Sequence, residues 1–361
     1  MTDPKRYQAY LDLVSGRRRG AGAAVLRGLL RVGAGPYALA AGLRNWAYGC
    51  GLRRVAKIDA PVVSVGNITA GGTGKTPLVQ WLARRLRERG VRVAVLSRGY
   101  GARALPEDRA DVAGNDETDM LAANLPDVPQ LVDPDRVASA RIAVGELGMQ
   151  CLILDDGFQH RRLARDLDIV TIDALNPFGY RHLLPRGLLR EPVRSLRRAH
   201  VIVLTRCDQS DGVPDLHRRI ARIAPDAAVV ESRHAPVDLV DAHDASEPLD
   251  RLRGCRIVAV CGIGNPEGFR RTLADCGADI AAFLAFPDHH AYTPDDRRTV
   301  YETAAEAGAE AVVTTQKDLA KLVAGTPPPR TTRALRVELE VTAGGGLLDD
   351  HLRGIIGGVG A

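Results

Sequence analysis

Aromatic residues are scarce in this sequence, and its N-terminal region has no apolar run long enough to cross a membrane. Phe, Trp and Tyr make up only 4% of the 361 residues, so a core must be built mainly from Ala, Val, Leu and Ile. The longest uncharged run of that region, Val32 to Leu43, has 12 residues, whereas a membrane-spanning helix needs roughly 20. A signal-peptide pattern is also absent. The sequence therefore predicts a globular chain without a spanning helix at its start.

Paired metal-binding cysteines are missing as well. Six cysteines are present, but none forms a Cys-x-x-Cys pair, and no His joins them at metal-finger spacing. Several stand in apolar runs, as in CLILDD and VAVCGIG. We therefore expect buried free thiols in a reducing compartment rather than a zinc site.

The charge balance is mildly basic. The formal net charge of +5 at pH 7 suits anionic partners such as a nucleotide or an anionic lipid. The basic residues are scattered and no aromatic stacking motif accompanies them, so nucleic acid is not an expected partner. Residues 20–50 combine arginines and leucines with Trp46 and Tyr48, which fits a helix lying on a membrane surface. A helix packed on the rest of the protein explains the same composition equally well.

The stretch VSVGNITAGGTGKTP, which begins at Val63, contains most of a phosphate-binding loop. Such a loop needs glycines that let backbone N–H groups converge on phosphate oxygens, a Lys for the β and γ phosphates, and a Ser or Thr hydroxyl for Mg²⁺. The usual motif has glycine where this chain has Thr69, but an apolar run precedes the loop and a helical pattern follows it. We therefore predict that a nucleotide phosphate binds to the following residues: Thr69, Ala70, Gly71, Gly72, Thr73, Gly74, Lys75 and Thr76.

Short apolar runs alternate with helical stretches from residue 60 onward. The continuous apolar runs are those expected of parallel strands buried on both faces, at 61–67, 91–100, 150–156, 168–173 and 200–206. A second series begins at Cys255 with a strand, a turn and a helix. The predicted fold class is α/β: a P-loop NTPase-like parallel sheet flanked by helices, with a second, smaller α/β domain. The predicted parts are a basic amphipathic N-terminal segment (1–55), a first domain (56–235), a linker (236–254) and a C-terminal domain (255–361).

Two carboxylates follow the apolar run in CLILDDGFQHRRL. A carboxylate at the end of a buried strand beside a phosphate loop commonly holds Mg²⁺. Asp155 and Asp156 would point to opposite faces if the strand continued, so one of them is expected to meet the metal. Helix capping by Asp156 is the structural alternative. His160 can meet a phosphate or a carboxylate, although a lone His is more often structural.

Phosphoryl transfer also needs a group that orients or deprotonates the attacking hydroxyl. Asp116 and Glu117 precede an apolar helical stretch, where helix capping by Asp116 is the simpler interpretation. Asp288, His289 and His290 stand in a turn after a predicted strand. Spacing alone does not link these two segments.

Several motifs in this order resemble the tetraacyldisaccharide 4′-kinase family, the lipid A 4′-kinases of Gram-negative bacteria. The resemblance covers nearly the whole chain, and DDGFQHRRL, LLREP and FPDHHAY are highly specific. The remaining motifs are VGNITAGGTGKTP, LSRGYG, the acidic pair at 116–117 and TTQKDLAKL. Members of this family also lack the first loop glycine, so Thr69 is the family's own version of the loop.

The resemblance implies a reaction and its reactants. ATP and Mg²⁺ would act on the 4′-hydroxyl of an acylated glucosamine disaccharide 1-phosphate, giving the bisphosphorylated lipid A precursor. The protein would be peripheral on the cytoplasmic face of the inner membrane, and residues 20–50 would face that membrane. No obligate protein partner is expected.

Site residues follow from the same resemblance. The catalytic carboxylate would be Asp116, although this chain reads NDET where the family has a GDEP-like segment. His289, from the second domain, would pair with it. Lys75 and Thr76 would bind phosphate and Mg²⁺, and Asp155 and Asp156 would hold the metal. The other active-site residues implied are Glu117, His160, Arg190 and Glu191.

Two other functions fit parts of the pattern. The first is a nucleotide switch or partitioning-type ATPase, and LTRCD at 204–208 is faintly similar to a guanine-specificity motif, although a strand end explains it more simply. The second is a P-loop kinase or ligase for a soluble metabolite, whose activity should survive deletion of residues 1–50.

Overall fold

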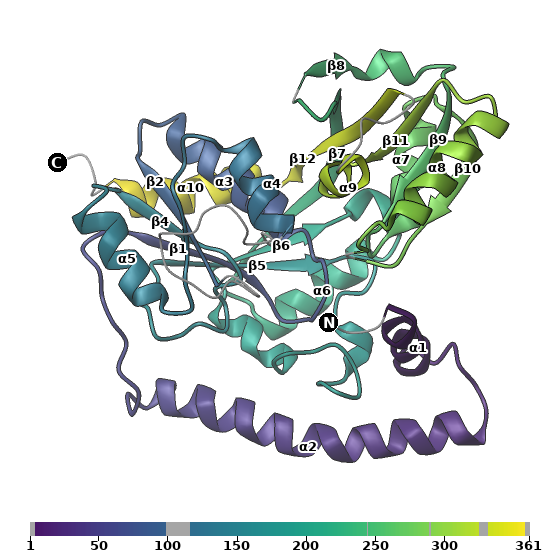
Figure 1. Ribbon diagram of the computed structural model, residues 1–361. Helices are drawn as coiled ribbons and strands as arrows, with labels where there is room; N and C mark the ends of the chain where they lie inside the picture. The colour runs from purple at the N-terminus through teal and green to yellow at the C-terminus, as the bar shows by residue number, and fades with distance from the viewer. Residues whose placement is uncertain (1–3, 99–115, 244, 289, 325–330, 358–361) are drawn as a thin grey trace. The chain divides into compact units, whose positions relative to one another are not determined.

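The computed structural model describes residues 4–98, 116–243, 245–288, 290–324 and 331–357 (Figure 1). The chain forms two compact units. The large unit contains residues 11–233 and 339–361, and the small unit contains residues 1–10 and 234–338. Two long strands, β7 (Ala228–Val240) and β12 (Thr331–Ala343), each have residues in both units.

The large unit is built on a parallel sheet in the order β3-β2-β4-β1-β5-β6-β7. The remaining strands are β1 (Val62–Asn67), β2 (Val93–Ser97), β3 (Gln130–Val132), β4 (Cys151–Leu154), β5 (Leu167–Asp173) and β6 (Val201–Thr205). Its helices are α2 (Ala21–Gly49), α3 (Lys75–Arg87), α4 (Asp116–Asn124), α5 (Arg136–Gly145), α6 (Val213–Ile223) and α10 (Gly345–Ile356). Helix α1 (Pro4–Val14) has residues in both units.

Alternate side chains of β1 pack on opposite faces of this sheet. Val63 and Val65 belong to the core that contains residues of α3 and α10, whereas Val62 packs with residues of α5. All six residues of β1 are buried, which agrees with an apolar parallel strand covered on both sides. The sheet therefore holds the end of β1 rigidly where the phosphate loop begins.

The small unit repeats this architecture on a smaller scale. Its strands β9 (Arg256–Cys261), β10 (Asp279–Ala285), β11 (Ala311–Thr315) and β12 lie in the order β10-β9-β11-β12, and all three neighbouring pairs are parallel. Residues of α7 (Pro266–Asp275) pack with one side of β9, and residues of α8 (Pro294–Glu306) pack with the other. Helix α9 (Gln316–Val323) directly follows β11, and the short strand β8 (Ser246–Pro248) pairs antiparallel with β7.

The fold class agrees with the prediction, but the structure divides the chain elsewhere. Residues 236–254, expected as a linker, hold the end of β7, β8 and a 3₁₀ turn of the small unit. Residues 339–361, expected in the second domain, belong to the large unit. The physical reason is α10, because Leu348 and Leu352 are fully buried in the core around α3 and β1.

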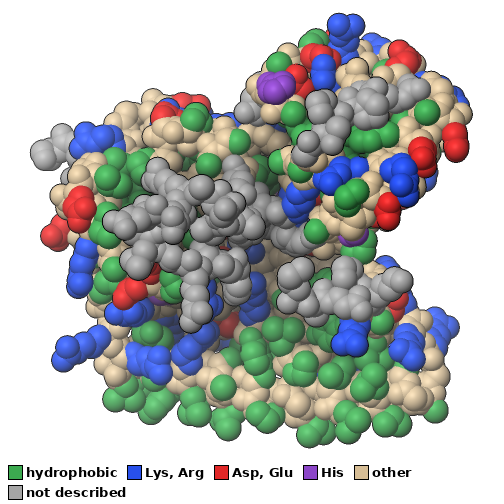
Figure 2. Space-filling view, in the orientation of Figure 1, with side chains coloured by type: hydrophobic (Ala, Val, Ile, Leu, Met, Phe, Trp, Pro, Cys, Tyr) green, Lys and Arg blue, Asp and Glu red, His purple; other side chains and the backbone are tan. Residues whose placement is uncertain are grey.

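Helix α2 lies along the large unit and carries an apolar stripe on its outward side (Figures 1 and 2). Large apolar side chains recur at intervals of three, four or seven residues, and each is 54% to 76% exposed: Val25, Leu29, Val32, Leu39, Leu43 and Trp46. The spacing places them on one face of the helix. Among the residues that the structure describes, no helix has both the length and the apolar character needed to cross a bilayer.

Candidate active site

The phosphate loop joins the end of β1 to the start of α3. Gly71 has φ 110° and Gly74 has φ 80°, values in the left-handed region that favours glycine. Lys75 and Thr76 then form the first turn of α3, where unpaired backbone N–H groups favour an anion. This is the strand–loop–helix arrangement predicted for residues 69–76.

Thr69, at the position where the usual motif has glycine, is part of a paired, extended segment. It forms an antiparallel β-bridge with Leu189, and the next N–H, that of Ala70, donates to the carbonyl of Leu188 at 2.7 Å. Thr69 is 6% exposed and does not have a positive φ. The loop therefore starts in extended backbone, which requires no glycine.

Side chains at and just beyond the ends of β1 and β6 fix the middle of the loop. Asn67 Nδ2 donates to Thr73 Oγ1 at 2.9 Å, and Thr205 Oγ1 donates to the Thr73 carbonyl at 3.1 Å. Arg206 donates to the carbonyl of Gly72 at 3.1 Å and forms an ion pair with Asp173. Sequence reasoning missed these supporting residues, because their partners lie up to 134 positions away.

Asp155 and Asp156 do not continue the strand as the sequence suggested. Strand β4 ends at Leu154, and Asp156 adopts φ 49° in the left-handed region. The chain then crosses β1, where Gly157 N–H donates to the Val65 carbonyl at 2.8 Å. No helix starts at Asp156, so the capping alternative does not apply. Asp155 is 9% exposed and lies beside the phosphate loop, because β4 and β1 are adjacent and parallel.

Three basic residues surround Asp156. Arg190 Nη1 lies 2.9 and 2.8 Å from the two carboxylate oxygens, and Lys75 Nζ lies 3.6 Å from Oδ1. Arg136, which no sequence signal marked, donates to the Asp156 carbonyl at 3.1 Å. Burial raises the pKa of the Asp156 carboxyl, but Lys75 and Arg190 outweigh burial and leave that pKa below its ordinary value. The carboxylate is therefore ionised and held by the loop lysine.

His160 lies four residues beyond Asp156 and is uncharged near neutral pH. Burial, together with the positive charge of Arg136, lowers its pKa from 6.5 to about 4. Its Nε2 is buried and has no hydrogen-bond partner among the described residues. A neutral ring with one unpaired nitrogen can accept or donate one hydrogen bond to a bound group.

Arg190 and Glu191 face different surroundings. Arg190 points to Asp156, whereas Glu191 is fully buried and accepts hydrogen bonds from Arg198 at 2.9 Å and from Asn45 of α2 at 2.7 Å. Burial raises the pKa of Glu191, but the bonds from Arg198 and Asn45 outweigh burial and lower it. Arg190 is thus directed to the phosphate loop, and Glu191 is directed to α2.

The predicted acid–base residues are described only in part. Asp116 and Glu117 are the first residues of α4, and α4 follows β2, the strand next to β4. The structure does not describe the side chains of Asp116 and Glu117, and His289 lies outside the described residues. In the small unit, Asp288 accepts a hydrogen bond from Lys317 at 3.2 Å.

Oxygen ligands for a divalent cation are available at the loop. Thr76 and Asp155 are buried hard-oxygen donors at the ends of adjacent elements, the chemistry that Mg²⁺ prefers. Within the described residues, no group of three His, Cys, Asp or Glu side chains is close enough to hold a metal alone. A magnesium ion here would thus share its coordination with phosphate oxygens, as in other phosphate-loop enzymes.

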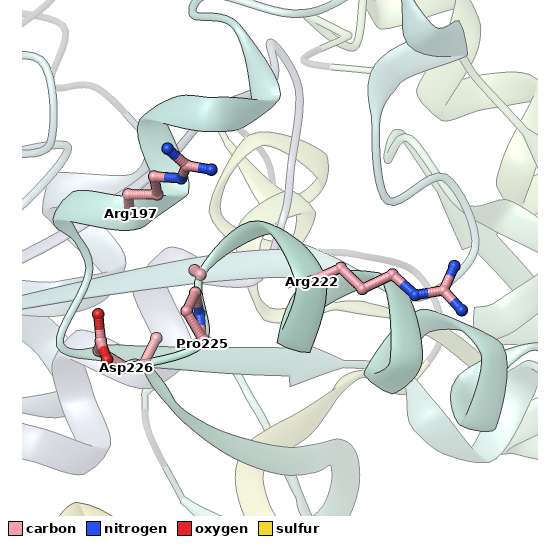
Figure 3. Close-up of a pocket in the computed structure, with 6 residues that line it drawn as sticks. Arg197, Arg222, Pro225 and Asp226 are labelled. Atoms are coloured by element: carbon pink, nitrogen blue, oxygen red, sulfur yellow. The ribbon is translucent and has the colours of Figure 1, made fainter.

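A cavity elsewhere in the large unit plays no part in this arrangement. It measures about 270 Å³ and is lined by Arg197, Arg222, Ala224, Pro225, Asp226 and Ala227. In Figure 3 the side chain of Arg222 points away from Arg197, and Arg197 Nε donates to the carbonyl of Ile223 at 3.0 Å. None of the predicted site residues lines it.

Comparison with known proteins identifies one family. The family model described as tetraacyldisaccharide-1-P 4′-kinase matches residues 26–355. The tetraacyldisaccharide 4′-kinase of Anaeromyxobacter sp. (strain Fw109-5) is 46% identical over 348 residues, which cover 93% of this chain and 92% of the relative. That of Geobacter sulfurreducens is 42% identical over 322 residues, covering 86% and 89%.

A solved structure agrees with these relatives. The crystal structure of an "apo" form LpxK from Aquifex aeolicus in complex with ATP matches with a TM-score of 0.72 and 29% sequence identity, covering 91% of this chain and 99% of that one. The motifs, the phosphate loop and these comparisons agree, and the chain belongs to the tetraacyldisaccharide 4′-kinase family.

Proposed function

We propose that this protein transfers the γ-phosphate of ATP to the 4′-hydroxyl of an acylated glucosamine disaccharide 1-phosphate. The observation that carries the proposal is the convergence of Lys75 and Arg190 on Asp156 beside the phosphate loop, in a chain 46% identical to a tetraacyldisaccharide 4′-kinase. The product is the bisphosphorylated lipid, and ADP leaves.

ATP binds at the loop of residues 69–76. The positive φ angles of Gly71 and Gly74 let the backbone N–H groups of the loop point toward the phosphates. When ATP binds, Lys75 leaves Asp156 and contacts the β and γ phosphates. The Aquifex aeolicus structure in complex with ATP supports ATP as the nucleotide. Arg190 and His160 complete the phosphate side, one as a cation and the other as a neutral hydrogen-bonding group.

Thr76, Asp155 and Asp156 would hold the Mg²⁺ that accompanies ATP. Both oxygens of Asp156 are engaged by Arg190, so direct contact of Asp156 with the ion requires Arg190 to move. The ion would neutralise charge on the β and γ phosphates. The protein's contribution is to place these oxygens beside the loop on two adjacent parallel strands and one helix terminus.

Asp116 is the base in this proposal, and His289 orients it or tunes its pKa. Asp116 accepts the proton of the 4′-hydroxyl while that oxygen attacks the γ-phosphorus in line with the departing ADP. Glu117 stands beside the base in the same helical turn. Positioning and charge stabilisation supply most of the rate gain, and the base contributes roughly two to four decades.

The outward stripe of α2 faces the bilayer that contains the lipid acceptor. Its six exposed apolar side chains would insert into the membrane interface, and Arg27 and Arg31 of α2 would meet anionic headgroups. The protein is therefore proposed to be peripheral, on the cytoplasmic side of the inner membrane, without an obligate protein partner.

The test is phosphorylation of the acylated disaccharide 1-phosphate by Mg-ATP in detergent, with Asp116→Ala alongside. We expect a 4′-phosphorylated lipid from the native chain, and turnover lower by a factor of about 10² to 10⁴ in the variant with nearly unchanged ATP affinity. Equal transfer by both proteins would remove Asp116 as the base. No transfer by a folded, ATP-binding native chain would favour a soluble-substrate kinase or a nucleotide switch.

A further inference from the structure

The inward side of α2 contacts both segments that carry the residues around the phosphate loop. Tyr37 OH donates to the carbonyl of Arg190 at 3.0 Å, and Asn45 Nδ2 donates to Glu191 Oε2 at 2.7 Å. From the other segment, Arg161 donates to the carbonyl of Asn45 at 2.9 Å. One helix thus holds residues 190–191 and the segment that follows Asp155 and Asp156.

The main chain of Arg190 is fixed on both sides. Its N–H donates to the carbonyl of Ile68 at 2.7 Å, at the start of the phosphate loop, and its carbonyl accepts from Tyr37 of α2. Its guanidinium then reaches the carboxylate of Asp156. Displacement of Arg190 from α2 would therefore act on the loop and on Asp156 together.

Glu191 makes this attachment strong. A fully buried carboxylate is stable only where hydrogen bonds and opposite charges replace its lost hydration. Arg198 supplies bonds at 2.9 and 3.3 Å, while Asn45 and Arg44 of α2 donate at 2.7 and 3.4 Å. Loss of the α2 donors would leave this buried charge only partly compensated.

We propose that Tyr37 and Asn45 are positioning residues, through which α2 holds Arg190 and Glu191 in place for phosphoryl transfer. The inference rests on the proposed function and assigns α2 a second role beside surface contact. The two roles lie on opposite sides of one helix: Tyr37 and Asn45 face the body of the large unit, whereas Leu39 and Leu43 are 64% and 54% exposed.

The experiment compares variants of the two sides of α2 in the full chain, with Mg-ATP and the acylated disaccharide 1-phosphate in detergent micelles. Tyr37→Phe keeps the ring and removes only the hydroxyl, and Asn45→Ala removes the bond to Glu191. We expect kcat to fall about two- to tenfold in each, the effect of one hydrogen bond, with the KM for lipid little changed. Leu39→Ala, the matched control, should keep kcat and raise the KM for lipid.

A mutant cycle tests whether Tyr37 acts through Arg190. In an Arg190→Ala background, Tyr37→Phe should lower kcat less than in the native chain, because the guanidinium is gone and only the main-chain bond of residue 190 to the loop remains to be positioned. The inference would be overturned if the losses of kcat in Tyr37→Phe and Arg190→Ala multiplied in the double variant. It would also be overturned if Leu39→Ala lost as much kcat as Tyr37→Phe.

Hydrogen exchange gives a readout that does not depend on turnover. Amides of residues 186–191 and 68–70 should exchange faster in Asn45→Ala than in the native chain, and Leu39→Ala should match the native chain. If the native chain transfers no phosphate, the proposed function fails, and exchange alone decides the positioning inference. Native exchange in Asn45→Ala would refute it even where transfer is observed.

Discussion

Gly66 in β1 is the position where a single added methyl group should damage the site most directly. The segment after Asp156 crosses β1 so closely that a Cβ at residue 66 would lie 2.5 Å from the Cβ of Phe158 and 2.6 Å from its backbone nitrogen. Phe158 is fully buried, and a backbone atom cannot turn aside as a flexible side-chain end can. Gly66→Ala therefore requires the crossing segment to move by close to an ångström.

The expected size of this effect follows from two contributions. Overpacking in a close-packed core destabilises by about 1–3 kcal/mol, and weakening the bond from Gly157 N–H to the Val65 carbonyl adds about 1 kcal/mol. A total of roughly 2–4 kcal/mol corresponds to a melting temperature lower by roughly 4–16 °C for a domain of this size. Turnover should fall by up to about a hundredfold, because Asp155 and Asp156 directly precede the displaced segment.

Gly28→Ala is the matched control. Gly28 lies in α2, where an added Cβ meets no atom within 4 Å, so alanine should stabilise the helix by about 0.5–1 kcal/mol. Calorimetry and the lipid phosphorylation assay are applied to both variants. Native melting temperature and native turnover in Gly66→Ala would refute the close approach of the crossing segment to β1.

Three further predictions concern charge and reactivity. Lys75→Ala should lower kcat/KM for ATP by at least about a hundredfold while the fold is retained, as measured by steady-state kinetics and circular dichroism; unchanged ATP use would contradict the role of the loop. Because the pKa of His160 falls from 6.5 to about 4 on folding, the unfolded chain binds a proton that the native protein does not, and stability should decline by up to roughly 3 kcal/mol as pH drops through that window. His160→Asn should flatten this part of the pH profile in denaturant titrations. Alkylation of the native protein should label Cys50 first, since Cys50 is exposed while burial raises the pKa of Cys151 and Cys261 to about 12; mass spectrometry of the labelled peptides checks the order.

The parallel strands could be predicted because their signal is local. A strand buried on both faces is a continuous apolar run, and β1 lies within the predicted range 61–67. Strand β7 contains the polar run Glu231–His234 and Pro236, so its composition does not distinguish it from a loop, and its pairing partners decide its conformation. Strand β12 alternates polar and apolar residues over 335–341, which is a strand signal that the prediction did not use. Helix α10 was missed because its place depends on the distant core around α3.

The free thiols show a similar limit. All six cysteines carry free thiols, as predicted, but Cys151 and Cys261 are buried while Cys207, Cys255 and Cys276 are half-buried. The residue type and the sequence context predicted free thiols, but the exposure of each thiol depends on tertiary packing.

Asp156 marks the limit of prediction within the site. The sequence indicated two carboxylates at a strand end, and this was correct. The left-handed turn at Asp156 and its contact with Arg190, 34 residues later, depend on tertiary structure. A pattern can name such residues, but it cannot tell which of two adjacent carboxylates is bound by arginine.

The absent loop glycine and the LLREP motif have one physical explanation. Residues 188–190 run beside the start of the phosphate loop, with bonds from Ala70 N–H to the Leu188 carbonyl and from Arg190 N–H to the Ile68 carbonyl. Thr69 is bridged between them to Leu189, and extended, paired backbone favours a β-branched residue over glycine. Here the supporting segment also carries Arg190 to Asp156 and Glu191 to α2, so the departure at Thr69 and the LLREP motif belong to the same construction.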